Sequence, residues 1–174
     1  MHPKRFLRLL TPIFCLSVLG SAMSALALPE DSKQQIEVAA SSGQLLLNDG
    51  WSTIKGKPEL PARVSQGSMQ ISGTEIRVFT RNDELQTVIA TGSPARFQQQ
   101  LNPGQEPAKA SAKTINFDNK TRLLILDNTV ELNQGGKVVV GDHVEYNIDT
   151  GAASASGKDG EQAHITIPPK KGKP

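Results

Sequence analysis

The second half of this chain repeats the first at a constant offset of 68 residues, in the pattern of paired β-strands. Residues 66–78 align without a gap on residues 134–146, and Gly73 coincides with Gly141. The same offset carries a later set of residues onto its counterpart, namely Gly92, Ala95, Arg96 and Phe97 onto Gly160, Ala163, His164 and Ile165. Turn glycines and apolar positions repeat, whereas the polar residues between them differ. This is the repetition of a structural framework rather than of a catalytic site.

The N-terminal segment has the three parts of a secretory signal peptide. Lys4, Arg5 and Arg8 form a basic head, a short apolar stretch follows, and residues 25–27 read Ala-Leu-Ala. We therefore predict cleavage after Ala27 and export of residues 28–174. The apolar stretch is too short to span a bilayer comfortably, and the only cysteine lies in its middle, which argues against a lipoprotein anchor.

Without its signal peptide the chain is small, nearly neutral and free of cysteine. Removing 27 residues from 174 leaves 147, and the 19 basic residues fall to 16 against 17 acidic ones. The fold must then be held by its core and its strand pairing, because no disulfide is available. A chain of this length predicts one domain, over residues 28–167. The remaining basic cluster, in a flexible tail of residues 168–174, is too small and too terminal to indicate nucleic-acid binding.

Short alternating runs separated by Gly, Asn, Asp and Pro predict an all-β fold. Gly67 and Gly135 lie where tight hairpins need positive φ, and Gly73 and Gly141 lie where one strand gives way to the next. No stretch as long as ten residues keeps helical apolar spacing without an interruption. The predicted strands are residues 36–39, 44–47, 51–55, 62–65, 69–72, 75–80, 85–90, 95–100, 112–118, 122–126, 129–132, 138–140, 143–148, 152–156 and 163–167.

The sequence offers little catalytic chemistry. After processing, His143 and His164 are the only histidines, and both fall at predicted outward strand positions. Asp142 precedes His143, but no second ligand stands at metal-site spacing, so we predict no metal, no cofactor and no catalytic residue. Scattered carboxylates leave open a hydrolase whose acidic pair meets only in space.

The two ends of the strand series are predicted to be edges that bind other chains. Residues 36–39 and 164–167 are β-prone, and an edge strand carries unpaired N–H and C=O groups. The predicted contact residues are Ile36, Val38, Ile165 and Ile167. The alternative is that each edge is covered by a neighbouring loop or blunted by Pro168.

Taken together, the signal, the repeat and the open ends resemble the OstA-like (LptA-like) family of periplasmic lipopolysaccharide-transport bridge proteins. The matching segments cover nearly the whole processed chain. They are residues 36–40, 64–78, 92–97, 123–146 and 165–171.

The resemblance implies an open, slightly twisted β-jellyroll of about 16 antiparallel strands in two facing sheets. It implies head-to-tail stacking of such units in the periplasm, with an LptC-like inner-membrane component at the N-terminal edge and an LptD-like outer-membrane translocon at the C-terminal edge. Lipopolysaccharide acyl chains would move through the shared apolar groove, and the protein itself would catalyse nothing.

The expected lipid-binding residues are apolar residues at alternate strand positions, whose side chains are expected to point between the two sheets. Many of them are also expected to pack against the opposite sheet. They are Val38, Ile54, Val64, Ile71, Ile76, Val78, Phe97, Phe117, Leu126, Val130, Leu132, Val139, Val144 and Tyr146.

Two departures from the family pattern fall near the N-terminal end. Residues 56–67 form a longer hairpin than expected and hold two prolines, and Ser41 stands where an acidic residue is expected. They bear on the interface with the inner-membrane partner more than on the fold. Two other functions stay open from the sequence, namely a periplasmic or surface glycan-binding module and the hydrolase described above.

Overall fold

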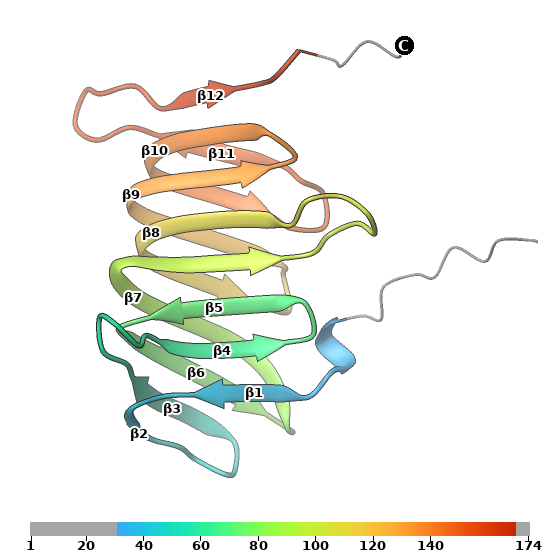
Figure 1. Ribbon diagram of the computed structural model, residues 1–174, viewed down its shortest axis with the longest axis vertical. Helices are drawn as coiled ribbons and strands as arrows, with labels where there is room; N and C mark the ends of the chain where they lie inside the picture. The colour runs from blue at the N-terminus through green and yellow to red at the C-terminus, as the bar shows by residue number, and fades with distance from the viewer. Residues whose placement is uncertain (1–30, 170–174) are drawn as a thin grey trace, which may run out of the picture.

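The computed structural model describes residues 31–169, and the predicted signal peptide and residues 170–174 of the predicted tail lie outside them. Within the described range the fold is all-β, as predicted, apart from one 3-10 turn (Figure 1). The elements are η1 (Asp31–Lys33), β1 (Ile36–Ala39), β2 (Ser42–Gln44), β3 (Gly50–Lys55), β4 (Ala62–Gln66), β5 (Met69–Gly73), β6 (Glu75–Arg81), β7 (Glu84–Gln99), β8 (Ala108–Asp118), β9 (Leu123–Gln134), β10 (Lys137–Asn147), β11 (Ala153–Ser156) and β12 (His164–Thr166).

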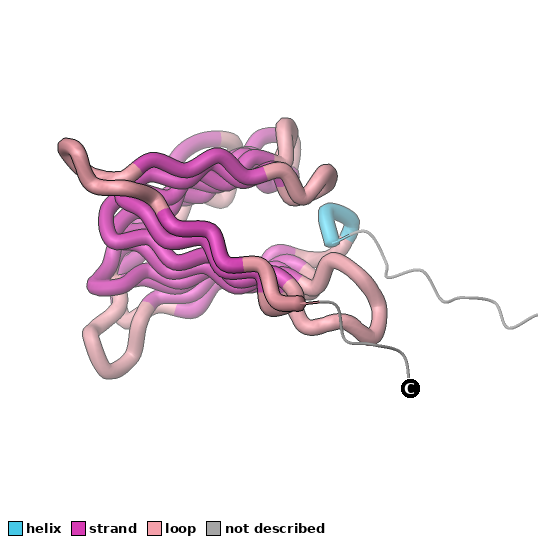
Figure 2. Tube along the Cα trace, turned by 90° about the horizontal axis from the view of Figure 1, so that it is seen from above, coloured by secondary structure: helices cyan, strands magenta, loops and turns pink. Residues whose placement is uncertain are grey.

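The twelve strands form one continuous antiparallel sheet that folds over into two facing layers (Figures 1 and 2). The four long strands β7 to β10 each run through both layers, and the pairing register shifts where they cross, for example between Thr91 and Ala95 in β7. Layer A is ordered β1-β4-β5-β7-β8-β9-β10-β12, and layer B is ordered β2-β3-β6-β7-β8-β9-β10-β11. Each layer thus contains eight strand segments, in agreement with the expected count.

The two long sides of the molecule differ. On the folded side the long strands turn from one layer into the other, at residues 91–95, 111–114 and 141–143. On the open side the chain reverses within each layer through turns and loops, and no strand crosses between the layers (Figure 2).

The sequence repeat is a repeat of pairing register. Val64 pairs with Ile71, which pairs with Phe97, and the same pairing recurs 68 residues later at Leu132, Val139 and Ile165. Gly73 ends β5 where a Cβ would lie 2.5 Å from the backbone oxygen of Thr91, so only glycine fits the crossing from layer A to β6 in layer B. The second copy crosses within β10, by a register shift after Gly141.

The core lies between the layers and follows the alternation along the strands, which changes phase at the register shifts. In β6, Ile76 and Val78 are buried and the intervening Arg77 is exposed, and β10 repeats this with Val144 and Tyr146 around Glu145. Aliphatic side chains and alanines fill most of this space, with the rings of Phe97 and Phe117 at a centroid distance of 6.1 Å. Burial of these apolar groups stabilises the fold in the absence of disulfides.

Several predicted strand boundaries were wrong, each for a local reason. Three pairs of short predicted strands are single strands, β7, β9 and β10, because the bulges at the folded side bend a strand without ending it. Residues 44–47 are not a strand beyond Gln44, and the three leucines that follow are exposed. β8 begins at Ala108 rather than at residue 112, since strand pairing overrides the low β-propensity of its Ala-Lys-Ala start.

The segment with two prolines is not a hairpin between neighbouring strands. β3 pairs with β6 in layer B and β4 pairs with β1 and β5 in layer A, so residues 56–61 connect the layers. Lys57 and Leu60 close this connection with two backbone hydrogen bonds of 2.9 and 3.0 Å. The prolines therefore lie in a connection between the layers, where their missing backbone N–H groups do not interrupt the hydrogen bonds between strands.

Candidate functional site

The apolar residues predicted to line a groove lie on the inward faces of the two layers, and all but one of them are buried. Thirteen of them are at most 7% exposed and belong to one continuous buried cluster. They are Ile54, Val64, Ile71, Ile76, Val78, Phe97, Phe117, Leu126, Val130, Leu132, Val139, Val144 and Tyr146. The exception is Val38, which is 40% exposed because β1 is the last strand of its layer. The structure therefore places these residues on inward faces, packed against one another.

Further inward residues were not among the candidates. Alternation identifies most of them, but Leu85 and Ala112 are separated from the next buried residue by a register shift. Several others are alanines, whose small side chains give a weak apolar signal. They include Met69, Leu85, Val88, Ala90, Ala95, Ala110, Ala112, Ile115, Leu124 and Ile148.

One buried polar atom on the inward face has no hydrogen-bond partner. The hydroxyl of Tyr146 is enclosed in the core, and burial raises the pKa of this phenol above its ordinary value. A buried hydroxyl without a partner costs about 1–3 kcal/mol. The interior is thus apolar with a single unsatisfied hydroxyl in its C-terminal half, among the described residues.

At the N-terminal end both layers finish in edges that no other strand of residues 31–169 pairs with, β1 in layer A and β2 in layer B (Figure 1). Ile36 packs against the core, and Val38 is exposed beside it. Between these edges lies a cavity of about 210 Å³ lined by Val38, Ser52, Val78 and the three leucines at 45–47. Leu47 is 94% exposed, so this end presents apolar side chains to solvent.

At the C-terminal end β11 and β12 are the outermost strands (Figure 1). β12 pairs with β10 on one side only, and Ile165 is 59% exposed. Ile167 follows the strand and is 69% exposed. The predicted edge residues are therefore at the two ends of the molecule, and neither described edge is covered by another strand.

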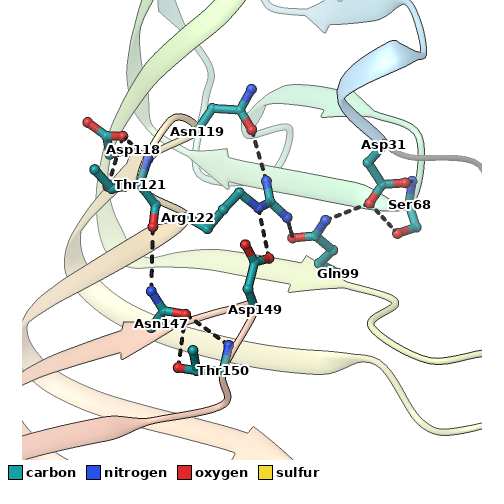
Figure 3. A network of polar contacts seen from close by, with 10 residues as sticks. All are labelled: Asp31, Ser68, Gln99, Asp118, Asn119, Thr121, Arg122, Asn147, Asp149 and Thr150. Carbon is teal, nitrogen blue, oxygen red and sulfur yellow. Dashed lines mark hydrogen bonds and ion pairs between the residues drawn. The ribbon is translucent and has the colours of Figure 1, made fainter.

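A chain of polar contacts crosses the open side from layer A to layer B, which we call the open-side network (Figure 3). Its centre is Arg122, which donates to Asn119 Oδ1 at 2.8 Å, to Gln99 Oε1 at 3.3 Å and to Asp149 Oδ1 at 3.3 Å. Gln99 ends β7 in layer A, and Arg122 precedes β9 in layer B. On the other side of Gln99, its Nε2 donates to Asp31 of η1 at 2.6 Å.

A cavity of about 460 Å³ lies at this network, between the layers. Polar groups of Gln99, Arg122, Gln134 and Thr150 form part of its rim, whereas Leu101 and Ile148 line it from the core. The opening is therefore lined mainly by polar groups, and Leu101 and Ile148 are the apolar residues that connect it to the core.

The histidine singled out from the sequence lies on the outer face of layer B, as predicted. His143 Nδ1 is 2.6 Å from Asp127 Oδ1, and Nε2 is 3.6 Å from Glu145 Oε1. The hydrogen bond to Asp127 raises the pKa of His143 above its ordinary value, with a smaller contribution from Glu145. No group of three or more potential metal ligands occurs among residues 31–169. In this same part of the chain no helix has the length and hydropathy of a membrane span.

Comparison with known families finds one whose model matches residues 37–152, two thirds of the chain. The family is described as "LptA/(LptD N-terminal domain) LPS transport protein".

Two curated proteins are similar over most of their length. The chain is 31% identical over 176 residues to the lipopolysaccharide export system protein LptH of Pseudomonas aeruginosa, covering 96% of this chain and 98% of that protein. It is 24% identical over 162 residues to the lipopolysaccharide export system protein LptA of Haemophilus influenzae, covering 91% of each.

The fold is also similar to a solved structure. The crystal structure of LptH from Pseudomonas aeruginosa, described as the LptA-homologous periplasmic component of the lipopolysaccharide transport device, superposes with a TM-score of 0.71. The superposition covers 81% of this chain and 100% of the LptH chain, and the two sequences are 23% identical. The similarity confirms the two-layer β-fold.

Proposed function

The chain belongs to the LptA/LptD N-terminal-domain family of lipopolysaccharide transport proteins, and from this membership we propose that it carries lipopolysaccharide between its two layers. It is a component of lipopolysaccharide export, as its relatives are. The observation that carries the proposal is an apolar interior between two layers that end in free strand edges and that no strand of the described residues joins along the open side. Neither the glycan-binding alternative nor a hydrolase is favoured, and we propose that the protein is not an enzyme.

The physical task of such a protein is to keep acyl chains out of water. Each exposed methylene costs about 0.8 kcal/mol, so a lipid with several chains does not cross an aqueous compartment unaided. Side chains such as Val144 and Leu126 offer apolar contact without directional bonds, which lets a chain slide. Because the interior is packed, lipid must replace contacts between the layers, and the open side is where the layers are joined by side chains rather than by strands.

The two ends support head-to-tail assembly. A free strand edge pairs with another chain through main-chain hydrogen bonds, and neighbouring apolar side chains add burial. β1 and β2 with Leu47 form one such end, and β12 with Ile165 forms the other. We assign the N-terminal end to an LptC-like inner-membrane component, the C-terminal end to an LptD-like translocon, and both to other copies of this chain. The setting is the periplasm, after cleavage near Ala27.

A pair of identical substitutions in β10 tests the proposal. Val144 is fully buried between the layers, whereas Val140 on the same strand is 44% exposed. Val144→Asp places a charge in the interior, so we expect it to lower the free energy of unfolding by several kcal/mol and to abolish lipopolysaccharide co-purification. Val140→Asp is expected to leave both unchanged.

A milder pair keeps the test valid if Val144→Asp does not fold. Val144→Thr preserves shape but adds a hydroxyl to the interior, whereas Val140→Thr adds one to the surface. We expect reduced lipid recovery from the first only. Equal recovery of lipopolysaccharide from folded Val144 and Val140 variants would contradict binding between the layers.

A further inference from the structure

The carboxylate of Asp31 lies in a pocket of hydrogen-bond donors at the open side (Figure 3). Its Oδ1 accepts the backbone N–H of Ser68 at 2.8 Å. Its Oδ2 accepts the Ser68 hydroxyl at 2.7 Å and the side-chain amide of Gln99 at 2.6 Å. These three donors, which we call the Ser68 cradle, come from the β4–β5 turn and from the end of β7.

The turn is shaped to admit an anion. Gly67 has a φ of +58°, and a Cβ at this position would lie 2.3 Å from Asp31 Oδ1. A residue with a side chain would therefore be strained there and would also displace the carboxylate. Backbone and side-chain donors that converge on a glycine turn are a common way to hold an anion.

The second copy of the repeat shows that the turn itself does not need the acid. Gly135 has the same φ of +58°, and a Cβ at this position would have no heavy atom within 4 Å. Gly136 takes the place of Ser68, so the hydroxyl donor is missing. The same hairpin thus forms without a carboxylate, and the cradle is a feature added to the first copy only.

The segment that carries Asp31 is held by other bonds. The buried side-chain amide of Gln66 donates to the backbone oxygens of Ser32 and Gln34 at 3.1 and 3.0 Å. The Asp31 side chain can therefore leave the cradle by rotation while η1 keeps its place. The cradle adjoins the cavity of about 460 Å³, and Gln99 links it to Arg122 through a 3.3 Å hydrogen bond.

We propose that the Ser68 cradle is a subsite for a phosphate group of the lipopolysaccharide headgroup, and that Asp31 occupies it as an intramolecular competitor. This proposal rests on the proposed function. Phosphate oxygens accept the same N–H and O–H donors as a carboxylate, and charge-assisted bonds of this kind are the stronger ones. A lipid whose acyl chains lie between the layers leaves its headgroup at the open side, next to the guanidinium of Arg122.

Calorimetric titration of the full chain with inorganic phosphate and glucosamine 1-phosphate tests the cradle without lipid. Asp31→Ala removes the competitor, and we expect affinity for both probes to rise about tenfold, which corresponds to about 1.4 kcal/mol. Asp49→Ala is the matched control, because Asp49 also accepts a backbone N–H, from Asn82 at 2.6 Å. It should leave affinity unchanged. Adding Ser68→Ala to Asp31→Ala should remove most of the gain.

A comparison of binding to lipopolysaccharide with and without its phosphate groups tests whether the anion in the cradle comes from the lipid headgroup or is free phosphate. Asp31→Ala should bind the phosphorylated lipid more tightly and the dephosphorylated lipid as wild type does. No gain with either small probe, or a gain that survives Ser68→Ala, would overturn the cradle. A gain with inorganic phosphate but not with phosphorylated lipid would overturn the headgroup assignment. Failure of wild type to bind any lipopolysaccharide would refute the proposed function. The titrations with inorganic phosphate and glucosamine 1-phosphate would still show whether the cradle binds an anion.

Discussion

Two polar side chains of β10, His143 and Tyr146, face opposite sides of the same layer and differ in whether their polar atoms have partners. The ring of His143 points outward and contacts Asp127 and Glu145. The hydroxyl of Tyr146 points into the core and has none. Strand parity therefore gives the His143 ring charged partners on the surface and leaves the Tyr146 hydroxyl without one in the core.

Tyr146→Phe is expected to stabilise the unliganded protein. The substitution keeps the ring and removes a buried hydroxyl without a partner, so the free energy of unfolding should rise by about 1 kcal/mol. Urea unfolding of the two proteins measures this difference. A destabilised Phe variant would mean that the hydroxyl is bonded in solution.

The His143–Asp127 contact predicts a pH dependence of stability. Because the folded pKa of His143 lies above its ordinary value of 6.5, its contribution is fully present below pH 6.5 and is lost as pH rises through the folded pKa. The melting temperature of wild type minus that of His143→Gln should therefore fall across this window. His164→Gln, on exposed β12, is the control. A difference that does not change with pH would show that the ion pair adds nothing to stability.

At the scale of elements, β12 and β2 have the least support of the outer strands, since each makes three residue pairs with one neighbour and has no buried residue. β12 pairs with β10, and all three of its residues are exposed. Such a strand contributes little stability of its own and is available for the edge pairing that we propose.

Truncation before Ile165 is expected to shorten or abolish head-to-tail oligomers while changing the melting temperature little. Light scattering of purified protein measures the oligomer sizes. Removal of residues 170–174 alone, which leaves β12 intact, is the matched control. Unchanged oligomers in the longer truncation would rule out pairing through this edge.

The sequence predicts elements better than it predicts contacts between them. Alternation and the repeat placed most strands and the inward face, because both depend on neighbours within a strand. The joining of predicted strands into β7, β9 and β10 was missed, since a bulge gives the same sequence signal as a turn. The open-side network was also missed, because Asp31 and Gln99 meet from 68 positions apart, and no local pattern marks such a pair.

At the scale of the whole molecule, the fold is one sheet closed along one side by its own strands and along the other by side chains. Burial between the layers supplies the stability, and the ends and the open side are where we propose that lipid enters and leaves. This division fits a carrier whose ligand moves along the fold rather than one that holds a ligand at a single point.

We propose above that lipopolysaccharide lies between the layers. Ultraviolet crosslinking in Gram-negative cells tests this position of the lipid. A photoreactive residue would replace Tyr146, which is 1% exposed, or its outward neighbour Glu145. We expect lipopolysaccharide adducts at position 146 and none at 145. Adducts at 145 alone, or at neither position in a folded and exported protein, would contradict this position of the lipid.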